Sequence, residues 1–203
     1  ASLEEENLLL IKKEEVERRL YLLNEQNRLA GEVHQGIEDR LGEMEEVIAR
    51  IGENPENKVK NLKQIHRIAL YCKRKSELVI KSKNKEDLPA QELCRIIHEM
   101  ATMVPETYSI FCQMDGRVKF TQAIDIYEYY NRIMELGIRY DIEETMTRIS
   151  KKSPTITINI LFDMKMKQYR HILEGSFEER ENFLFSIKEF EDSISIKLEI
   201  GGP

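Results

Sequence analysis

The sequence predicts an α+β protein in which a long antiparallel helical hairpin, forming a dimeric four-helix bundle, is followed by a small layer of helices on a mixed sheet. Three observations predict this fold. An apolar row recurs every seven residues from Leu9 to Ile51, a second helical pattern follows a Gly and Pro turn, and amphipathic helices then alternate with short strand-like segments. We therefore divide the chain into a hairpin, residues 1–83, and a second domain, residues 84–203.

The first helix is predicted for residues 3–52, with an apolar face wide enough for a bundle. Its main row is Leu9, Val16, Leu23, Ala30, Ile37, Met44 and Ile51, and a looser row is Leu20, Leu41 and Ile48. Gly52 suits the left-handed conformation at a helix end, and Pro55 prevents the helix from continuing.

The second helix is predicted for residues 57–83, and the short loop before it makes the two helices antiparallel. Its expected apolar face is Leu62, Ile65, Ala69, Cys72, Ser76 and Val79. Because a two-helix hairpin cannot bury so wide an apolar surface alone, we expect a homodimer.

The second half of the chain alternates helix and strand signals. After a polar linker at 81–89, helices are expected over 89–104 and 119–138, with the strand YSIFCQM between them. TITINILF reads as another strand, and NFLFSIKEF followed by SISIKLEI reads as a terminal β-hairpin.

The composition narrows the classes of function. Of the 203 residues 33% are charged, and the net charge of −6 gives no general attraction to nucleic acid or to an anionic membrane. We expect no nucleic-acid partner. The sequence has no apolar run of about 18 residues, so we expect neither a signal peptide nor a spanning helix. The chain begins in mid-helix, as a fragment of a longer protein would.

The three cysteines, Cys72, Cys94 and Cys112, are odd in number and widely spaced. Because no CxxC pair is present, the sequence predicts neither a disulfide framework nor a zinc site. We expect reduced thiols in a cytoplasmic protein.

The segment NRLAGEVHQGIEDRL, residues 27–41, places His34 at the edge of the apolar face, where its side chain can reach water. By position alone, His34 is an ordinary bundle residue. The segment resembles the phosphoacceptor box of sensor histidine kinases, which lies in the first helix of a dimeric hairpin. Arg28, Ala30, Glu32, His34, Gly36 and Leu41 match in place, and Leu29, Val33 and Ile37 match in kind.

The resemblance implies that the imidazole of His34 attacks the γ-phosphoryl group of a nucleotide and passes that group to an aspartate of a receiver domain. Two neighbouring residues depart from the family pattern. The family has an acid that acts as a general base where Gln35 stands, and often a water-positioning glutamine where Asp39 stands. His34, Gln35 and Asp39 are the candidate catalytic residues.

The element order of the second half is similar to the ATP-binding domain that follows the hairpin in that family. The family motif Glu-x-x-x-Asn-x-x-x-His matches only at Asn131, a candidate magnesium ligand, because Tyr127 and Glu135 occupy the other positions. Asp163 follows a strand, as the family's adenine-reading aspartate does, but the glycines beyond it are missing and Gly175 is alone. The resemblance implies a degenerate nucleotide domain, in a layout similar to the sporulation phosphotransferases.

We expect a two-component signalling protein that accepts or relays a phosphoryl group on His34, or acts as a pseudokinase. Its expected partners are a second copy of the chain, a response-regulator receiver domain and an upstream membrane sensor. The expected location is the cytoplasm, either as a free protein or as the cytosolic part of that sensor. Two alternatives stay open: an active divergent kinase, which would bind ATP and Mg²⁺, and a structural coiled-coil dimerisation module with an incidental His34.

Overall fold

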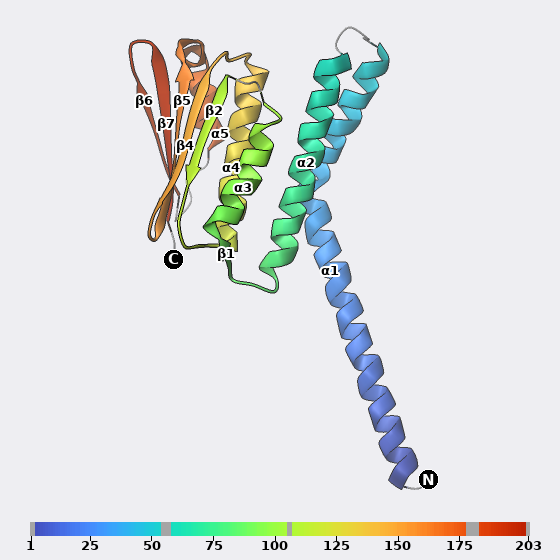
Figure 1. Ribbon diagram of the computed structural model, residues 1–203. Helices are drawn as coiled ribbons and strands as arrows, with labels where there is room; N and C mark the ends of the chain where they lie inside the picture. Colours follow the sequence, from blue (N-terminus) through green and yellow to red (C-terminus); the bar gives the residue numbers. More distant parts are fainter. Residues whose placement is uncertain (1–2, 54–57, 105–106, 178–182, 202–203) are drawn as a thin grey trace.

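The computed structural model describes residues 3–53, 58–104, 107–177 and 183–201, and most side chains of the first helix only from residue 12 onward. Helix α1 (Leu3–Glu53) and helix α2 (Lys58–Ser82) form an antiparallel hairpin, and the N-terminal half of α1 projects beyond it (Figure 1). The predicted heptad position Leu9 and the predicted turn at Gly52 and Pro55 lie outside the described side chains. In the described part of the chain no helix is long and apolar enough to cross a bilayer.

A mixed five-stranded sheet forms the far side of the molecule. Its strands are β2 (Tyr108–Gln113), β4 (Thr145–Lys152), β5 (Thr155–Asp163), β6 (Phe183–Glu189) and β7 (Ser193–Ile200), in the order β2-β4-β5-β7-β6. Strands β2 and β4 are parallel and all other neighbours are antiparallel. A separate ribbon pairs β1 (Asp87–Pro89) with β3 (Arg117–Lys119). The sequence did not predict β1, β3 or β4.

Helices α3 (Ala90–Ala101) and α4 (Phe120–Arg139) cover one face of this sheet, and a 3-10 turn η2 (Met164–Tyr169) leads into the short helix α5 (Arg170–Ser176). The core lies between helices and sheet because alternate strand residues point to the same face. On β5 these are Ile156, Ile158, Ile160 and Phe162, and on β7 they are Ile194, Ile196, Leu198 and Ile200. Helix α4 packs on the sheet with one side and on α2 with another (Figure 1).

Ile37 and Met44 of the predicted main row pack against the core, but within one chain the hairpin also buries residues that periodicity did not predict. Val47, in neither predicted row, is 0% exposed, whereas Ile48 is 51% exposed. On α2, Leu62 is exposed and Ile68 and Tyr71 are buried. The predicted apolar face of α2 was therefore right in part: Cys72 is buried and Ile65, Ser76 and Val79 are half-buried, whereas Leu62 and Ala69 are exposed. The reason is that α2 packs on α4 as well as on α1, and periodicity within the hairpin carries no information about that second contact.

The prediction of no disulfide was also wrong. Cys94 on α3 and Cys112 on β2 form a disulfide, with their Cα atoms 5.4 Å apart. The two cysteines are 18 residues apart and share no motif, so only the packing of α3 on the sheet brings them together. Cys72 on α2 is buried and free.

Candidate functional site

His34 lies on the exposed side of α1, and its two predicted companions, Gln35 and Asp39, are exposed as well. Gln35 and Asp39 are four residues apart and therefore share a helix face, which is rotated from the direction in which His34 points. His34 makes no hydrogen bond or ion pair with any residue that the structure describes. The side chains of Leu29 and Glu32 and the burial of Gly36 are not described. The arrangement presents the imidazole of His34 on the outside of a helix, with no partner among the described residues.

The three family positions on α4 are at intervals of four residues and therefore lie on one helix face. That face meets the hairpin. Tyr127, at the first position, stacks on Tyr71 of α2 with the ring centroids 5.6 Å apart and the ring planes 9° apart. An aromatic pair thus occupies the place where the family has its glutamate.

Asn131, the middle position, is 1% exposed and bonded at both ends of its amide. Its Nδ2 donates to Glu135 Oε1 at 2.9 Å, and its Oδ1 accepts from Arg67 Nη1 at 3.3 Å. Arg67, 3% exposed on α2, also forms an ion pair with Glu135 Oε1 at 3.0 Å. In this arrangement the candidate magnesium ligand uses its amide to join α4 to α2.

Helix α1 joins the same set of contacts through Arg40. Its guanidinium lies 2.8 Å from Glu135 Oε2 and 2.9 Å from Glu43 Oε2, and Gln64 Nε2 donates to Glu43 Oε1 at 3.1 Å. We call this set the interhelix network. Its members are Arg40, Glu43, Gln64, Arg67, Asn131 and Glu135, from helices α1, α2 and α4.

The contacts of the network favour the charged forms of Arg40 and Glu43. Burial acts to raise the pKa of Glu43, but hydrogen bonds from Arg40 and Gln64 outweigh burial and hold that pKa below its usual value. Burial likewise opposes the charge on Arg40, and Glu135 and Glu43 outweigh it and raise the pKa of Arg40. Each partly buried charge is therefore balanced by a partner of opposite sign.

Asp163, at the end of β5, is held by backbone groups. Its Oδ1 accepts from the backbone N–H of Lys165 at 2.8 Å, and its Oδ2 accepts from those of Glu143 at 2.9 Å and Glu144 at 3.3 Å. The carboxylate thus caps η2 and fixes the loop between α4 and β4.

Of the predicted site residues only Asn131 belongs to the interhelix network. Sequence reasoning missed Arg67, Arg40 and Glu135 as its partners. One signal was present, because Glu135 lies one helical turn after Asn131 and can reach it. No sequence signal linked Arg67 on α2 to Asn131 on α4, because the two residues are 64 positions apart in the chain. The described residues hold no group of three or more His, Cys, Asp or Glu side chains arranged for a metal ion.

The structural neighbours of this chain are a bacterial phosphotransferase and histidine kinase domains. The phosphotransferase is 8% identical, over 84% of this chain and 93% of that one, with a TM-score of 0.39. The histidine kinase domain of the E. coli osmosensor EnvZ is 10% identical, over 58% and 89%, with a TM-score of 0.40. Histidine kinase ThkA, in its complex with the response regulator protein TrrA, is 16% identical, over 95% and 66%, with a TM-score of 0.37.

No protein-family model matches this sequence, and no curated protein does either. Because the TM-scores lie below 0.5, the activity and partners of this chain have to be argued from its own residues.

Proposed function

We propose that this chain is a two-component signalling protein that accepts or relays a phosphoryl group on His34 and does not use ATP as the phosphoryl source. The single observation that carries the proposal is the contrast between His34, whose imidazole is exposed, and Asn131, whose amide is engaged by Arg67 and Glu135. A phosphoacceptor needs access to a donor, and a nucleotide site needs groups free to bind.

The proposed step is transfer between His34 and a phosphorylated aspartate on a response-regulator receiver domain. A ring nitrogen of neutral His34 attacks the phosphorus, the N–P bond forms, the P–O bond to the aspartate breaks, and the carboxylate leaves with the electron pair. The receiver brings the Mg²⁺ ion and the acidic groups. Gln35 and Asp39, exposed beside His34, contact the docked receiver and orient it.

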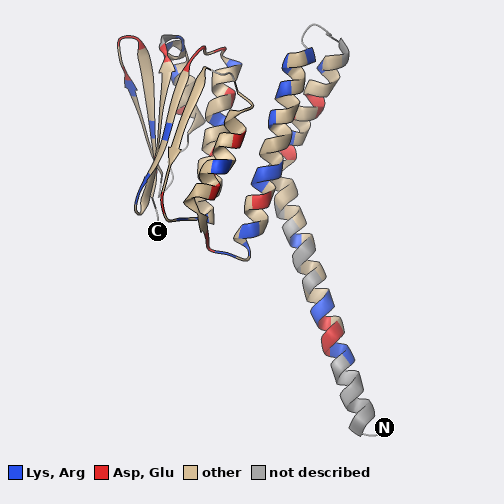
Figure 2. Cartoon of the chain, in the orientation of Figure 1, with Lys and Arg blue, Asp and Glu red and all other residues tan. Residues whose placement is uncertain are grey.

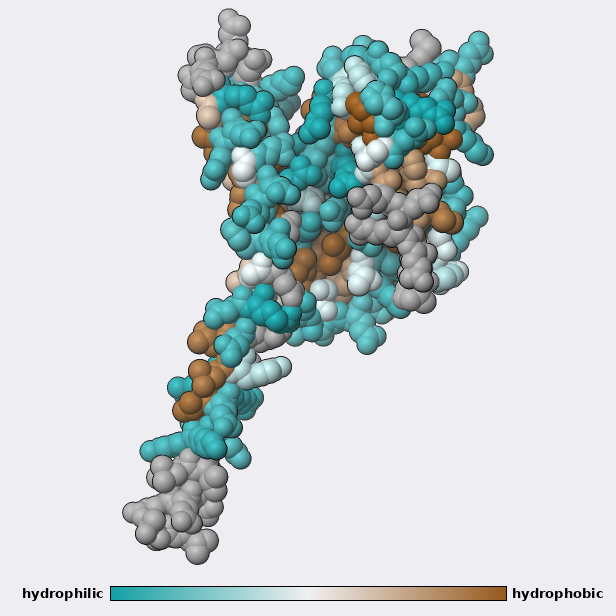
Figure 3. All heavy atoms as spheres, turned by 180° about the vertical axis from the view of Figure 1, so that it is seen from behind, coloured by the Kyte–Doolittle hydropathy of each residue, from teal (hydrophilic) through white to brown (hydrophobic). Residues whose placement is uncertain are grey.

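A homodimer is the second part of the proposal. Exposed apolar residues follow α1 on both sides of His34: Val16, Leu20, Leu23 and Ile48. Figure 3 shows hydrophobic side chains on the projecting part of α1. A second copy of the hairpin would cover this row, and an upstream membrane sensor could then act on the dimer in the cytoplasm by changing its helix packing.

Two alternative functions make different predictions for His34 and Asn131. A structural dimerisation module would use the exposed apolar row and leave His34 unmodified. An active divergent kinase would have to separate α4 from the hairpin before Asn131 could reach a nucleotide, because Arg67 and Glu135 occupy its amide.

The test is phosphotransfer from a receiver domain that carries labelled phosphoaspartate to the full chain without ATP. We expect an acid-labile label on the chain, lost in His34→Ala and retained in His66→Ala, because His66 is an exposed histidine on the other helix of the hairpin. Circular dichroism should show both variants folded. Label on the His34→Ala protein, or no label on the native chain from any receiver domain tried, would contradict the proposal.

A further inference from the structure

A cavity of about 580 Å³ lies between the hairpin and the second domain, separate from the exposed surface of His34. Its walls come from the first turns of α2, from the segment after α3, and from the end of α4. The volume falls in the range of about 300–1,000 Å³ that small-molecule sites occupy.

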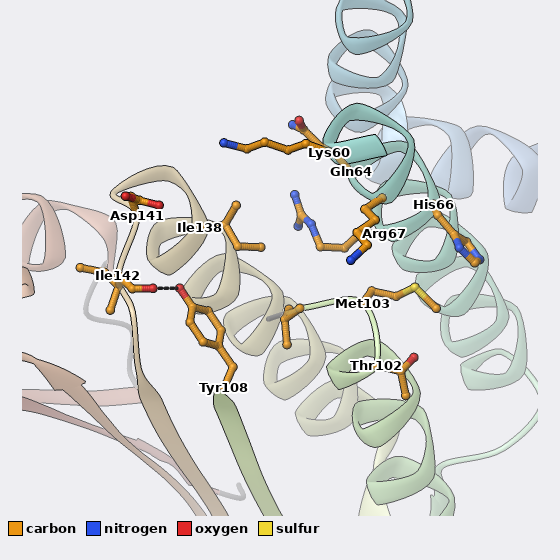
Figure 4. A pocket seen from close by; sticks show the side chains of 12 residues that line it. Lys60, Gln64, His66, Arg67, Thr102, Met103, Tyr108, Ile138, Asp141 and Ile142 are labelled. Atoms are coloured by element: carbon orange, nitrogen blue, oxygen red, sulfur yellow. Dashed lines mark hydrogen bonds between the residues drawn. The ribbon is translucent and has the colours of Figure 1, made fainter. Parts of the chain in front are cut away.

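One wall of the cavity is basic. Lys60, Lys63 and Arg67 are three and four residues apart, so they lie on one face of α2. Figure 4 shows the Lys60 side chain reaching from α2 toward the second domain, and Figure 2 shows basic residues along the first turns of α2. Lys60 and Lys63 form no ion pair with any residue that the structure describes. Two ammonium groups with no described ion-pair partner, in a chain of net charge −6, favour an anionic ligand.

The opposite wall is apolar and fixed. It includes Met103, Ile138 and the ring of Tyr108, whose hydroxyl donates to Ile142 O at 2.8 Å (Figure 4). Gly137 allows the ring to lie this close to α4, because a Cβ atom there would be 2.8 Å from the Tyr108 hydroxyl. Among the lining residues that the structure describes, the one acid is Asp141, which has Lys165 Nζ 3.3 Å from its carboxylate.

We propose that this cavity binds a small organic anion, with an apolar or aromatic body against Tyr108, Met103 and Ile138 and a phosphate or carboxylate group between Lys60 and Lys63. Because Arg67 belongs both to the cavity wall and to the interhelix network, the ligand joins α2 to the end of α4 beside that network. The site is independent of His34, so its test does not depend on phosphotransfer.

Binding is tested with phenyl phosphate and benzoate, which present the two anionic groups on one ring, and with phenol and inorganic phosphate as the separate halves. Ligand-observed NMR titrations of the full chain measure the dissociation constants. We expect at least one aromatic anion to bind at about 1 mM or tighter and both halves at least about tenfold more weakly. Which anion binds more tightly distinguishes a phosphorylated from a carboxylated ligand.

Two charge-reversal variants distinguish binding in the cavity from a general electrostatic attraction of the anion to the protein. Lys60→Glu/Lys63→Glu should weaken the bound anion at least about tenfold. Lys73→Glu/Lys152→Glu has the same net charge, replaces two exposed lysines outside the cavity, and should bind as the native chain does. His34→Ala should also bind normally. No binding of either aromatic anion at about 10 mM, or an equal loss in the two double variants, would overturn the proposal.

Discussion

Residues that resemble histidine-kinase motifs lie on two surfaces of this molecule: the surface around His34 and the side of α4 that faces the hairpin. The first surface is exposed to solvent, and we call it the open side. The second is packed against the hairpin, and we call it the closed side. His34, Gln35 and Asp39 are exposed on α1, whereas Tyr127, Asn131 and Glu135 are packed against α2 and α1. An acceptor histidine needs only one reactive nitrogen and access to its donor. A nucleotide site needs several groups free of other partners, and the amide of Asn131 is engaged by Arg67 and Glu135.

Two residues that depart from the family pattern account for the closed side. Tyr127 adds an aromatic ring that stacks on Tyr71, and Glu135 supplies the carboxylate that pairs with both Arg67 and Arg40. Both side chains hold α4 against the hairpin. The same helix face therefore serves as an interface between hairpin and second domain.

The largest effect is expected from breaking the closed side at Arg67. Arg67→Met removes the buried guanidinium and leaves Glu135 with less compensation, which should lower the free energy of unfolding by about 3 kcal/mol. Urea denaturation measures it. Arg148→Met is the control, because Arg148 is exposed on β4 and pairs with no residue that the structure describes. Equal stability of the two variants would show that the interhelix network does not hold the helices together.

A smaller effect is expected on the open side at Ile48. Ile48→Asp places a charge in the proposed dimer contact and should weaken association by at least about 2 kcal/mol. Within one chain the side chain is 51% exposed, so the monomer should stay folded. Light scattering with circular dichroism separates the two outcomes. A native chain that is monomeric at micromolar concentration would remove the homodimer from the proposal.

The pH dependence of stability tests the closed side at Glu43. We expect Glu43 to contribute about 1 kcal/mol or less to the free energy of unfolding at neutral pH. Because the pKa of Glu43 lies below its usual value of 4.5, its contribution is present above about pH 4.5 and is lost as pH falls through the folded-state pKa. The stability difference between the native chain and Glu43→Gln should therefore be largest near neutrality and shrink in acid. Glu46→Gln, at an exposed position on the same helix, should follow the native curve at every pH.

Addition of ATP at micromolar concentration should have almost no effect, because almost none of it should bind. Because the amide of Asn131 and the carboxylate of Asp163 are bonded within the protein, we expect a dissociation constant for ATP weaker than about 1 mM, or less than about 4 kcal/mol of binding. Calorimetry with Mg²⁺ and a non-hydrolysable analogue measures it. A micromolar constant would favour an active divergent kinase.

Much of the secondary structure followed from the sequence. The helices predicted over 89–104 and 119–138 are found as Ala90–Ala101 and Phe120–Arg139, and the terminal hairpin is found as β6 and β7, because each has its own periodicity or turn residues. Strand β4 was missed because its residues, TMTRISKK, carry a weak alternation and three basic side chains. Its place in the sheet comes from pairing with β2, which is distant in the sequence, and with β5, which follows β4 after a turn.

The sequence by itself determined that His34 would stand on a long helix at the edge of an apolar face, because heptad spacing fixes the direction of every side chain on a helix. It also determined that the family positions around Asn131 would share one face of α4. Only the tertiary structure decided what those faces meet. Arg67 reaches Asn131 and Glu135, and Cys94 reaches Cys112, because separate elements dock, and docking depends on the shape and charge of whole surfaces rather than on local periodicity.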